Sequence, residues 1–486
     1  MFKKLGLHTL IYGIGQILTQ FINFIFIPIY TNPAYLTISE NGLREILFSF
    51  MKFTEILINI GISTAYLRHF YDNEKKHNNL FFNSLIIISL NFLLIFSLFY
   101  FSKNFILTEF FKNKISFSYI SKSIIISYLN VIIILYLSLL RALEKPFLYI
   151  SIGLIKLISI GILNIFFLIL LKQHLKGFIN SYYYSLIIIT IIILIFHFLK
   201  HHDFNINFNI IKKLVIFAMP IGFINLLNWS IKLSNRLFLN QYFDEKLSGL
   251  FGIGSNIGTI IFIAFIAPFA IAWGPYSYKM DKEKKAIYAF PKIFIYVSII
   301  LSILSVGLSI FSKEIIKFII KDNYYLSSYK IVPFITIGYF FLGINYIVSV
   351  GINITKKTYL HLPVVITATI INIAGNIILI PKYKIFGAAI SFLISYMSFP
   401  FVSNFFSQKY YKINYNWSIL FKILVITICT ILLSLIINIK NLLLLLIIKM
   451  IIIIFFCIIL YHLFLNAEER TKITTYYEKI ISKIHL

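Results

Sequence analysis

Charged residues are scarce in this sequence. Only 13% of its 486 residues are Asp, Glu, Lys or Arg, and 17 carboxylates stand against 44 cations. A soluble protein of this length usually carries about twice that share of charged residues, most of them on its surface. The 59% of hydrophobic residues and the mean hydropathy of +0.90 instead indicate a polytopic membrane protein.

Cysteines and catalytic motifs are nearly absent as well. The two cysteines, Cys429 and Cys457, both fall in apolar segments, which argues against a disulfide framework. The sequence shows no Gly-rich phosphate loop, nucleophile elbow or Cys/His zinc pattern. We therefore expect no enzyme activity and no metal site, and the only cofactor we expect is a coupling ion, H⁺ or Na⁺.

Apolar segments of membrane-spanning length fill almost the whole chain. A helix needs roughly 20 apolar residues to cross a bilayer, and the connections are too short for an extramembrane domain. The sequence predicts an all-α polytopic membrane protein with about 14 transmembrane helices. They cover residues 6–30, 42–67, 79–101, 117–140, 147–171, 178–199, 214–240, 247–273, 291–312, 330–354, 360–380, 385–407, 418–438 and 442–464.

A weak internal repeat suggests how these helices are divided. The first and seventh segments each carry a polar face, which in the first is formed by Gln16, Gln20 and Asn23. Repeats of this kind commonly meet around a central site at the membrane midplane. We expect a six-helix bundle in residues 1–200, a second in 201–412, and two extra helices with a cytoplasmic tail in 413–486. The alternative is that both faces are ordinary packing surfaces.

The distribution of cations predicts the orientation. A net charge of +27 does not indicate nucleic-acid binding, because the cations are spread over short loops and form no separable basic domain. With the N-terminus placed inside, the loops on that side hold more Lys and Arg than the opposite loops. Cytoplasmic loops of membrane proteins show this enrichment. We expect a multi-pass protein with both termini in the cytoplasm.

The seventh segment carries the most polar stripe in the chain. Its members are three or four residues apart and share one helix face. A Lys or Arg that faces lipid there costs at least about 3 kcal/mol, so the stripe should face a wet interior. The residues are Asn225, Asn228, Trp229, Lys232, Asn235 and Arg236.

The second segment places Lys52, Glu55 and Asn59 on one face, with Glu55 near the midplane. One account is a structural ion pair between Lys52 and Glu55 that lowers the cost of both charges. The other is a buried carboxylate that carries a proton or binds Na⁺. Lys156 near the middle of the fifth segment either lines a cavity or is paired. Near the outer ends, Arg44 and Arg236 are able to snorkel, and Lys449 is expected to be peripheral.

Several stretches of the sequence together form a recognisable pattern. They are residues 12–31, 60–68 and 141–146, Ala272-Trp273-Gly274-Pro275-Tyr276, Asn372, Asn376, residues 380–383, and Gly387-Ala388-Ala389. In this order they resemble the bacterial oligosaccharide (O-antigen and polysaccharide) flippases of the multidrug/oligosaccharidyl-lipid/polysaccharide exporter superfamily. One departure is Asn235-Arg236, where the family commonly has Asp-Arg, and Lys384 replaces a customary Gly.

This resemblance implies alternating access by two bundles that move a polyprenyl-diphosphate-linked oligosaccharide to the outer leaflet of the bacterial inner (plasma) membrane. Membrane lipid is an implied partner, and a polysaccharide polymerase and chain-length proteins are further candidates. The diphosphate would meet Lys52, Lys156, Lys232 and Arg236. The sugars would meet Gln16, Gln20, Asn23, Asn59, Asn225, Asn228 and Trp229, and Glu55 would couple to an ion. Alternatives are a drug or cation exporter of the superfamily, a polysaccharide polymerase or ligase, and a lipid scramblase.

Overall fold

The structure is a computed structural model that describes residues 25–70, 77–200, 204–282, 286–355, 357–437, 441–464 and 470. Within these residues it contains helices and no strand. Twelve helices are long and apolar enough to span a membrane, or thirteen if a bent pair counts as one span. The predicted all-α polytopic class is confirmed. Each predicted segment after the first coincides with such a helix, and most of the first segment lies outside the described residues.

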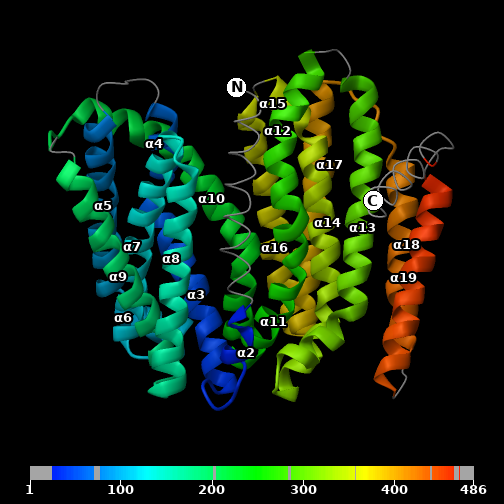
Figure 1. The fold of residues 1–486 in the computed structure, drawn as a ribbon, viewed down its shortest axis with the longest axis horizontal. Coiled ribbons are helices and arrows are strands. Elements are labelled where there is room, and N and C mark those ends of the chain that lie inside the picture. The colour runs from blue at the N-terminus through cyan, green and yellow to red at the C-terminus, as the bar shows by residue number, and fades with distance from the viewer. Residues whose placement is uncertain are drawn as a thin grey trace, which may run out of the picture.

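The first part of the chain forms one group of helices, coloured blue to green-blue on the left of Figure 1. We call it the first group. Its elements are α2 (Ile27–Tyr30), α3 (Ile38–Asn59), α4 (Ile62–His69), α5 (His77–Phe101), α6 (Lys103–Phe105), η2 (Ile106–Phe110), α7 (Phe117–Ala142), α8 (Pro146–Asn164), η3 (Ile165–Leu170) and α9 (His174–Lys200).

A second group follows on the right of Figure 1, and the two C-terminal helices pack against its α13. The second group comprises α11 (Glu245–Gly258), η4 (Phe262–Ile266), α12 (Ala267–Lys282), α13 (Ala286–Ile319), η5 (Asn323–Ile331), α14 (Val332–Val348), α15 (Val350–Ile354), η6 (Thr358–Leu360), α16 (His361–Tyr383) and α17 (Ile385–Tyr410). The C-terminal helices are α18 (Trp417–Ile436) and α19 (Leu442–Phe464).

Buried apolar side chains form two separate clusters that follow this grouping. One runs from Tyr30 to Ala218, and the other, apart from Ile27, runs from Ile231 to Leu460. The changeover falls inside one long helix, α10 (Phe208–Tyr242). The division predicted at residues 200 and 412 remains a prediction, because separate cores do not by themselves define domain boundaries.

Helix α10 connects the two groups. It contacts α3, α4 and α5 on one side and α11, α16 and α17 on the other. Pro220 lies inside it, and a proline within a helix removes one backbone hydrogen bond and favours a bend. Figure 1 shows α10 leaving the first group and descending between the two groups. Its C-terminal half therefore lies where the groups meet.

Helix α3 begins with a capping box and ends in a sharp break. The Thr37 side chain accepts a hydrogen bond from the Glu40 amide, and the Glu40 carboxylate accepts one from the Thr37 amide. At the other end, Gly61 has φ +84°, and a Cβ there would lie 2.7 Å from the Ala218 carbonyl oxygen. Glycine is thus required for both conformation and space. The axis bends by 42° into α4.

One ion pair fixes α19 against α13. The Lys449 ammonium donates to the Glu314 carboxylate at 2.7 Å and to the Ile310 carbonyl oxygen at 2.8 Å. Lys449 is only 5% exposed, but α19 lies at the outer edge of the molecule, so its predicted peripheral position holds (Figure 1). The pair has one charge of each sign and needs no further counter-ion.

We expect Glu314→Leu to destabilise the protein, because it leaves the buried Lys449 ammonium without a counter-ion. Breaking one partner of a buried pair costs about 3–5 kcal/mol, whereas replacing both partners by apolar residues is often neutral. The midpoint of thermal unfolding in detergent should fall for Glu314→Leu and recover for Glu314→Leu/Lys449→Leu. Lys317→Gln, an exposed residue on the same helix, is the control. Equal midpoints for the single and double variants would contradict the pairing.

Candidate functional site

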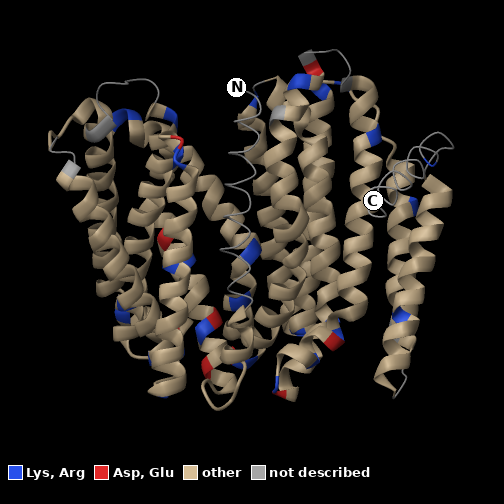
Figure 2. Cartoon of the chain, in the orientation of Figure 1, with Lys and Arg blue, Asp and Glu red and all other residues tan. Residues whose placement is uncertain are grey.

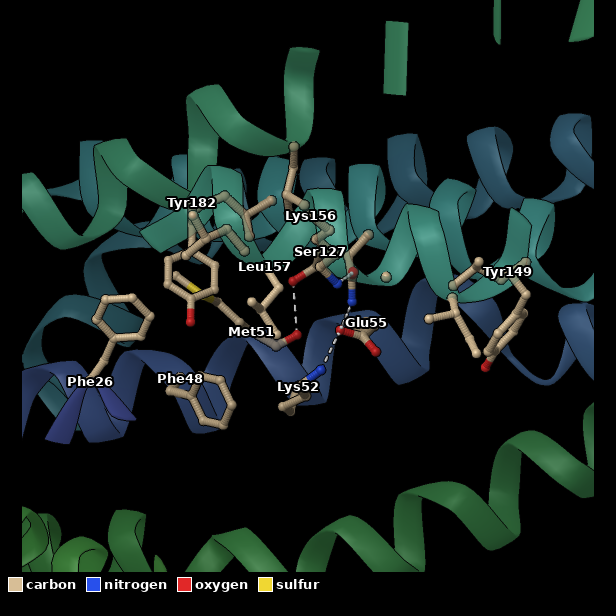
Figure 3. Close-up of a pocket in the computed structure, with 17 residues that line it drawn as sticks. Phe26, Phe48, Met51, Lys52, Glu55, Ser127, Tyr149, Lys156, Leu157 and Tyr182 are labelled. Carbon is tan, nitrogen blue, oxygen red and sulfur yellow. Dashed lines mark hydrogen bonds and ion pairs between the residues drawn. The ribbon is translucent and has the colours of Figure 1, made fainter. Parts of the chain in front are cut away.

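A cavity of about 230 Å³ lies within the first group. It is enclosed by α3, α7, α8 and α9, with Phe26 closing one side. Its charged and polar side chains form one polar wall, between Phe26, Phe48 and Tyr182 at one end of the cavity and Tyr149 at the other (Figure 3). The polar and aromatic lining residues are Phe26, Phe48, Lys52, Glu55, Ser127, Asn130, Tyr149, Lys156 and Tyr182.

Three helices supply a continuous polar chain along this wall. The Lys52 ammonium lies 2.9 Å from Oε2 of Glu55, one turn away on α3. The same oxygen accepts a hydrogen bond of 2.6 Å from the Asn130 amide on α7. The carbonyl oxygen of that amide accepts one from the Lys156 ammonium on α8. Glu55 and Asn130 therefore connect two lysines that are 104 residues apart in the sequence.

The charges on this wall do not balance. Lys52 and Lys156 share one carboxylate, which leaves a net charge of +1 beside the cavity. Burying an ammonium in a low-dielectric interior is costly without a partner, and an amide oxygen neutralises no charge. The chain thus satisfies the hydrogen bonds of Lys156 but leaves its charge available to an anion.

Packing between α3 and α7 holds the polar chain in register. The Ser127 hydroxyl on α7 donates to the Met51 carbonyl oxygen at 2.8 Å and lies 2.7 Å from the Thr54 hydroxyl. Small hydroxyl side chains let two helix backbones approach closely inside a membrane. This close approach brings Asn130 within reach of Glu55.

The structure brings Lys52, Glu55 and Lys156 together at one cavity. Lys232 lies elsewhere: it is half-buried on α10 with its ammonium 4.8 Å from the centre of the Phe262 ring. No carboxylate among the described residues pairs with it.

The predicted polar lining is dispersed. The Asn59 side chain accepts from the Ser63 amide and so caps α4, and Asn228 donates to its own helix at Ile224. Asn225 is exposed. None of these three side chains lines the cavity. The remaining predicted lining residues of the first segment, Gln16, Gln20 and Asn23, lie outside the described residues.

Trp229 and Arg236 instead join α10 to α3 where the two groups meet. The Trp229 indole N–H donates to the Ser49 carbonyl oxygen at 3.0 Å, and its ring packs against Phe53. One to two turns further along, the Arg236 guanidinium lies 2.8 Å from Glu45. These contacts lie toward the lower end of Figure 1, where α3 begins and α10 finishes. We call them, with the contacts described next, the lower seam.

The rest of the lower seam consists of polar contacts between the first group and residues 240–325. Glu245 accepts from Ser39 and pairs with Lys114 at 2.6 Å, and Asn41 donates to the Tyr325 hydroxyl at 2.8 Å. Two contacts involve backbone oxygens: Lys112 donates to Phe243 and Asn240 donates to Phe110. Figure 2 shows charged residues gathered toward the two ends of the molecule, with few between them.

Arg44 and Arg236 both bind Glu45 and do not snorkel. Arg44 is 6% exposed, Glu45 2% and Arg236 3%. The prediction that these arginines extend to the membrane surface is therefore wrong. The helix crossing explains it: a Cβ on Gly252 would lie 2.6 Å from Cδ of Glu45, so α11 covers the pair directly.

Asn235 belongs to a different contact. Its side-chain oxygen accepts from Asn376 at 2.7 Å, and Asn376 also donates to Asn372 at 3.2 Å. All three amides are fully buried between α10 and α16. This ladder is neutral, so Asn235 supplies no counter-charge to the neighbouring Arg236.

Two functional residues escaped prediction from the sequence. Asn130 is a single amide in an otherwise apolar helix, and its link to Glu55 depends on how α3 and α7 pack. Glu45 follows Arg44 directly, and its contact with Arg236 depends on how α3 and α10 pack. A buried carboxylate inside a spanning segment was the available signal, because such residues are rare and usually paired.

Comparison with known proteins gives the family. The model of a family described as polysaccharide biosynthesis protein matches residues 5–281, more than half of the chain. This chain belongs to the polysaccharide biosynthesis protein family. Its fold is that of flippases and transporters of the multidrug/oligosaccharidyl-lipid/polysaccharide exporter superfamily, as the resemblance indicated.

Solved structures share the fold at low sequence identity. The lipid II flippase MurJ in an inward closed conformation is 17% identical with a TM-score of 0.71, covering 94% of this chain and 98% of that one. An inward-facing MATE family multidrug transporter is 13% identical with a TM-score of 0.65, covering 80% and 94%. A transporter of the superfamily from Pyrococcus furiosus, described as having a binding pocket of reverse polarity, has a TM-score of 0.57 at 13% identity, covering 83% and 95%.

A curated relative matches a shorter stretch. An uncharacterized membrane protein of Methanocaldococcus jannaschii is 29% identical over 144 residues, which is 28% of this chain and 28% of that protein. The match thus spans less than a third of that relative's length.

A substitution at Gly42 tests whether α3 and α11 are in close contact at the lower seam. A Cβ at Gly42 would overlap the Glu245 carbonyl oxygen, whereas one at Gly307, in helix α13, would meet nothing. We expect Gly42→Ala to lower the thermal unfolding midpoint and Gly307→Ala to leave it unchanged or raise it, because alanine is the better helix former by about 1 kcal/mol. Equal effects of the two substitutions would show that α3 and α11 do not touch at Gly42.

Proposed function

We propose that this protein flips a polyprenyl-diphosphate-linked oligosaccharide from the cytoplasmic to the outer leaflet of the bacterial plasma membrane, for surface polysaccharide synthesis. The observation that carries this proposal is the net positive charge beside the cavity of the first group, where two lysines share one carboxylate. A diphosphate that crosses the hydrocarbon region needs cations in a protected site, since its charge is too costly to expose to lipid.

The lysines suit a diphosphate by charge and by position. Lys52 and Lys156 approach the cavity from α3 and α8 and are connected only through Glu55 and Asn130. Two ammonium groups along one wall of the cavity can both donate to the same anion, and such charge-assisted hydrogen bonds are roughly twice as strong as neutral ones. Lys232, whose charge has no carboxylate partner among the described residues, provides a third cation outside the cavity.

The rest of the cavity suits the remaining parts of such a lipid. Tyr149 and Tyr182 line the cavity at its two ends and offer aromatic faces against which sugar rings can pack (Figure 3). Its volume of about 230 Å³ is below the roughly 300–1,000 Å³ of ordinary ligand pockets. In this conformation it therefore accommodates part of a headgroup, and the prenyl tail remains in lipid.

Alternating access is supported by where the two groups touch. The hydrogen bonds and ion pairs described between the first group and the second lie at the lower end. The predicted enrichment of cations in cytoplasmic loops favours the upper end of Figure 1 as the cytoplasmic side. This conformation is then closed toward the outside, and flipping requires the lower seam to open. A polysaccharide polymerase and chain-length proteins would act on the product outside.

The main alternative, export of a cationic drug, requires a different cavity. A cationic substrate is stabilised by carboxylates, and this cavity holds one, already bound to Lys52 and Asn130. Among the superfamily members compared, the Pyrococcus furiosus transporter is described as having a pocket of reverse polarity that suggests a different function. The charge of the pocket therefore distinguishes a flippase for an anionic lipid-linked oligosaccharide from an exporter of cationic drugs.

We further propose Glu55 as the site of coupling to H⁺ or Na⁺, because it is the carboxylate of the cavity. Glu55→Gln keeps the size of the side chain and an oxygen that can accept the hydrogen bond from Asn130, but it removes the negative charge. We expect it to abolish the dependence of transport on an imposed proton or sodium gradient in proteoliposomes. Transport that responds to both gradients as in the wild type would assign Glu55 a structural role only.

The proposed function is tested with labelled lipid-linked oligosaccharide in proteoliposomes, by following exposure of the sugar to a membrane-impermeant glycosidase. Lys52→Gln and Lys156→Gln should each slow flipping by about tenfold or more, the expected effect of losing a charge-assisted contact. The corresponding arginine substitutions should retain part of the rate. Lys246→Gln, an exposed lysine of the lower end, should not change it. Absence of flipping by the wild type, or full activity of both glutamine variants, would refute the proposal.

A further inference from the structure

Two lysines at the lower end hold backbone conformations that favour glycine. Lys384 is the single residue between α16 and α17, and its φ of +53° with ψ of −126° lies in a region that glycine enters freely and other residues enter with strain. Lys112, two residues after η2, has a φ of +49°. A lysine at such a position lowers stability relative to glycine, so we looked for a use of each side chain.

Both side chains reach the same residue, Phe243, which follows α10 directly. The Lys112 ammonium donates to the Phe243 carbonyl oxygen at 2.9 Å, and the Lys384 ammonium lies 5.5 Å from the centre of the Phe243 ring. Lys112 belongs to the first group, whereas Lys384 belongs to the second. The two ammonium groups therefore approach each other across the lower seam.

The charges around Phe243 do not balance. Neither Lys112 nor Lys384 forms an ion pair within the described residues. The nearby carboxylates are engaged elsewhere, since Glu245 pairs with Lys114 and Asp244 caps the first turn of α11. Three lysines thus stand against two carboxylates. An ammonium group has three donors, so both lysines keep N–H groups for an anion.

Exposed aromatic side chains place this cluster at the level of lipid headgroups. Tyr242 directly precedes Phe243 and is 41% exposed, and Tyr383 directly precedes Lys384 and is 56% exposed. Tyrosines of membrane proteins gather where the hydrocarbon meets water, because the ring is apolar and the hydroxyl is polar. The anion that a membrane offers at this level is the phosphate of a lipid headgroup.

We propose that Lys112 and Lys384 bind the phosphate of an anionic phospholipid of the outer leaflet, which bridges the two groups and holds the lower seam closed. The inference rests on the proposed function only in that the lower seam opens during transport and faces outside. Opening separates the two lysines, because they belong to different groups. A ligand that both of them bind in the closed state shifts the equilibrium toward that state.

A thiol probe measures how the lipid affects opening. Ser248 is fully buried at the lower seam, and Ser248→Cys is introduced into a variant in which Cys429 and Cys457 are replaced by Ser. The protein is placed in nanodiscs of phosphatidylcholine with a rising fraction of phosphatidylglycerol. We expect phosphatidylglycerol to slow labelling of the new thiol by a maleimide, because labelling requires the seam to open.

Substitution of the lysines should weaken this response. Lys112→Gln or Lys384→Gln should each raise the half-effective fraction of phosphatidylglycerol about fivefold, the effect of one lysine near an anionic surface, and the double variant more still. Lys103→Gln and Lys317→Gln, which change exposed lysines of the same end, should leave it unchanged. An unchanged response of the double variant overturns the inference. Equal slowing by inorganic phosphate in pure phosphatidylcholine overturns the assignment to a lipid.

Lys384→Gly separates the side chain from the backbone. We expect it to raise the midpoint of thermal unfolding, because glycine adopts a φ of +53° without strain. It should also weaken the response to phosphatidylglycerol as Lys384→Gln does. Lys384→Arg should keep that response without raising the midpoint. If Lys384→Gly responds to the lipid as the wild type does, the Lys384 side chain has no part in binding.

Failure of this site can be told apart from failure of the proposed function. Flipping of labelled lipid-linked oligosaccharide is measured in proteoliposomes of the same lipid mixtures. A wild type that does not flip, but whose labelling responds to phosphatidylglycerol through the two lysines, refutes the proposed function and supports the site. A wild type that flips while its labelling ignores phosphatidylglycerol refutes only the site.

Discussion

One carboxylate shared by two cations is the arrangement on which the rest of the structure depends. It occurs twice on α3, as Glu55 between Lys52 and Lys156 at the cavity and as Glu45 between Arg44 and Arg236 at the lower seam. The two carboxylates are ten residues apart, about 15 Å along the helix. Each cluster carries a net charge of +1, and the cluster at the lower seam is buried. The contrast with Glu314 and Lys449 is informative, because that pair is balanced and joins helices that need not separate.

The imbalance decides what the site can bind. A balanced buried pair gains little from an added ion, since the charges already satisfy each other. An unbalanced cluster gains from an anion at the cavity and again at the seam. The neutral ladder of Asn235, Asn376 and Asn372 lies beside Arg236 and offers it no counter-charge. The proposed preference for an anionic substrate therefore rests on charge counts on α3, α8 and α10 rather than on one specific contact.

The sequence was sufficient for the helices but not for the contacts between them. Apolar runs of about 20 residues predicted the described spans correctly, and the pair Lys52 and Glu55 followed from their spacing on one helix. The link from Glu55 to Lys156 passes through Asn130 on a third helix, which no spacing reveals. Arg236 looked able to reach the membrane surface, but α11 covers it closely because Gly252 lacks a side chain. Depth in the membrane is readable from hydropathy, whereas the direction a residue faces depends on packing.

The location of both clusters on α3 has a mechanical consequence. The helix is anchored to α7 through Ser127 and Thr54, so the cavity charges move as one body with the first group. Its other end meets α10 and α11 through contacts that would break and re-form in the proposed transport cycle. Helix α3 carries the cavity residues at its middle and the lower-seam residues at its N-terminal end. If the helix is rigid, a displacement of one set of residues along its axis also displaces the other. An anion that draws α8 toward α3 at the cavity therefore acts on the same helix that holds the seam closed.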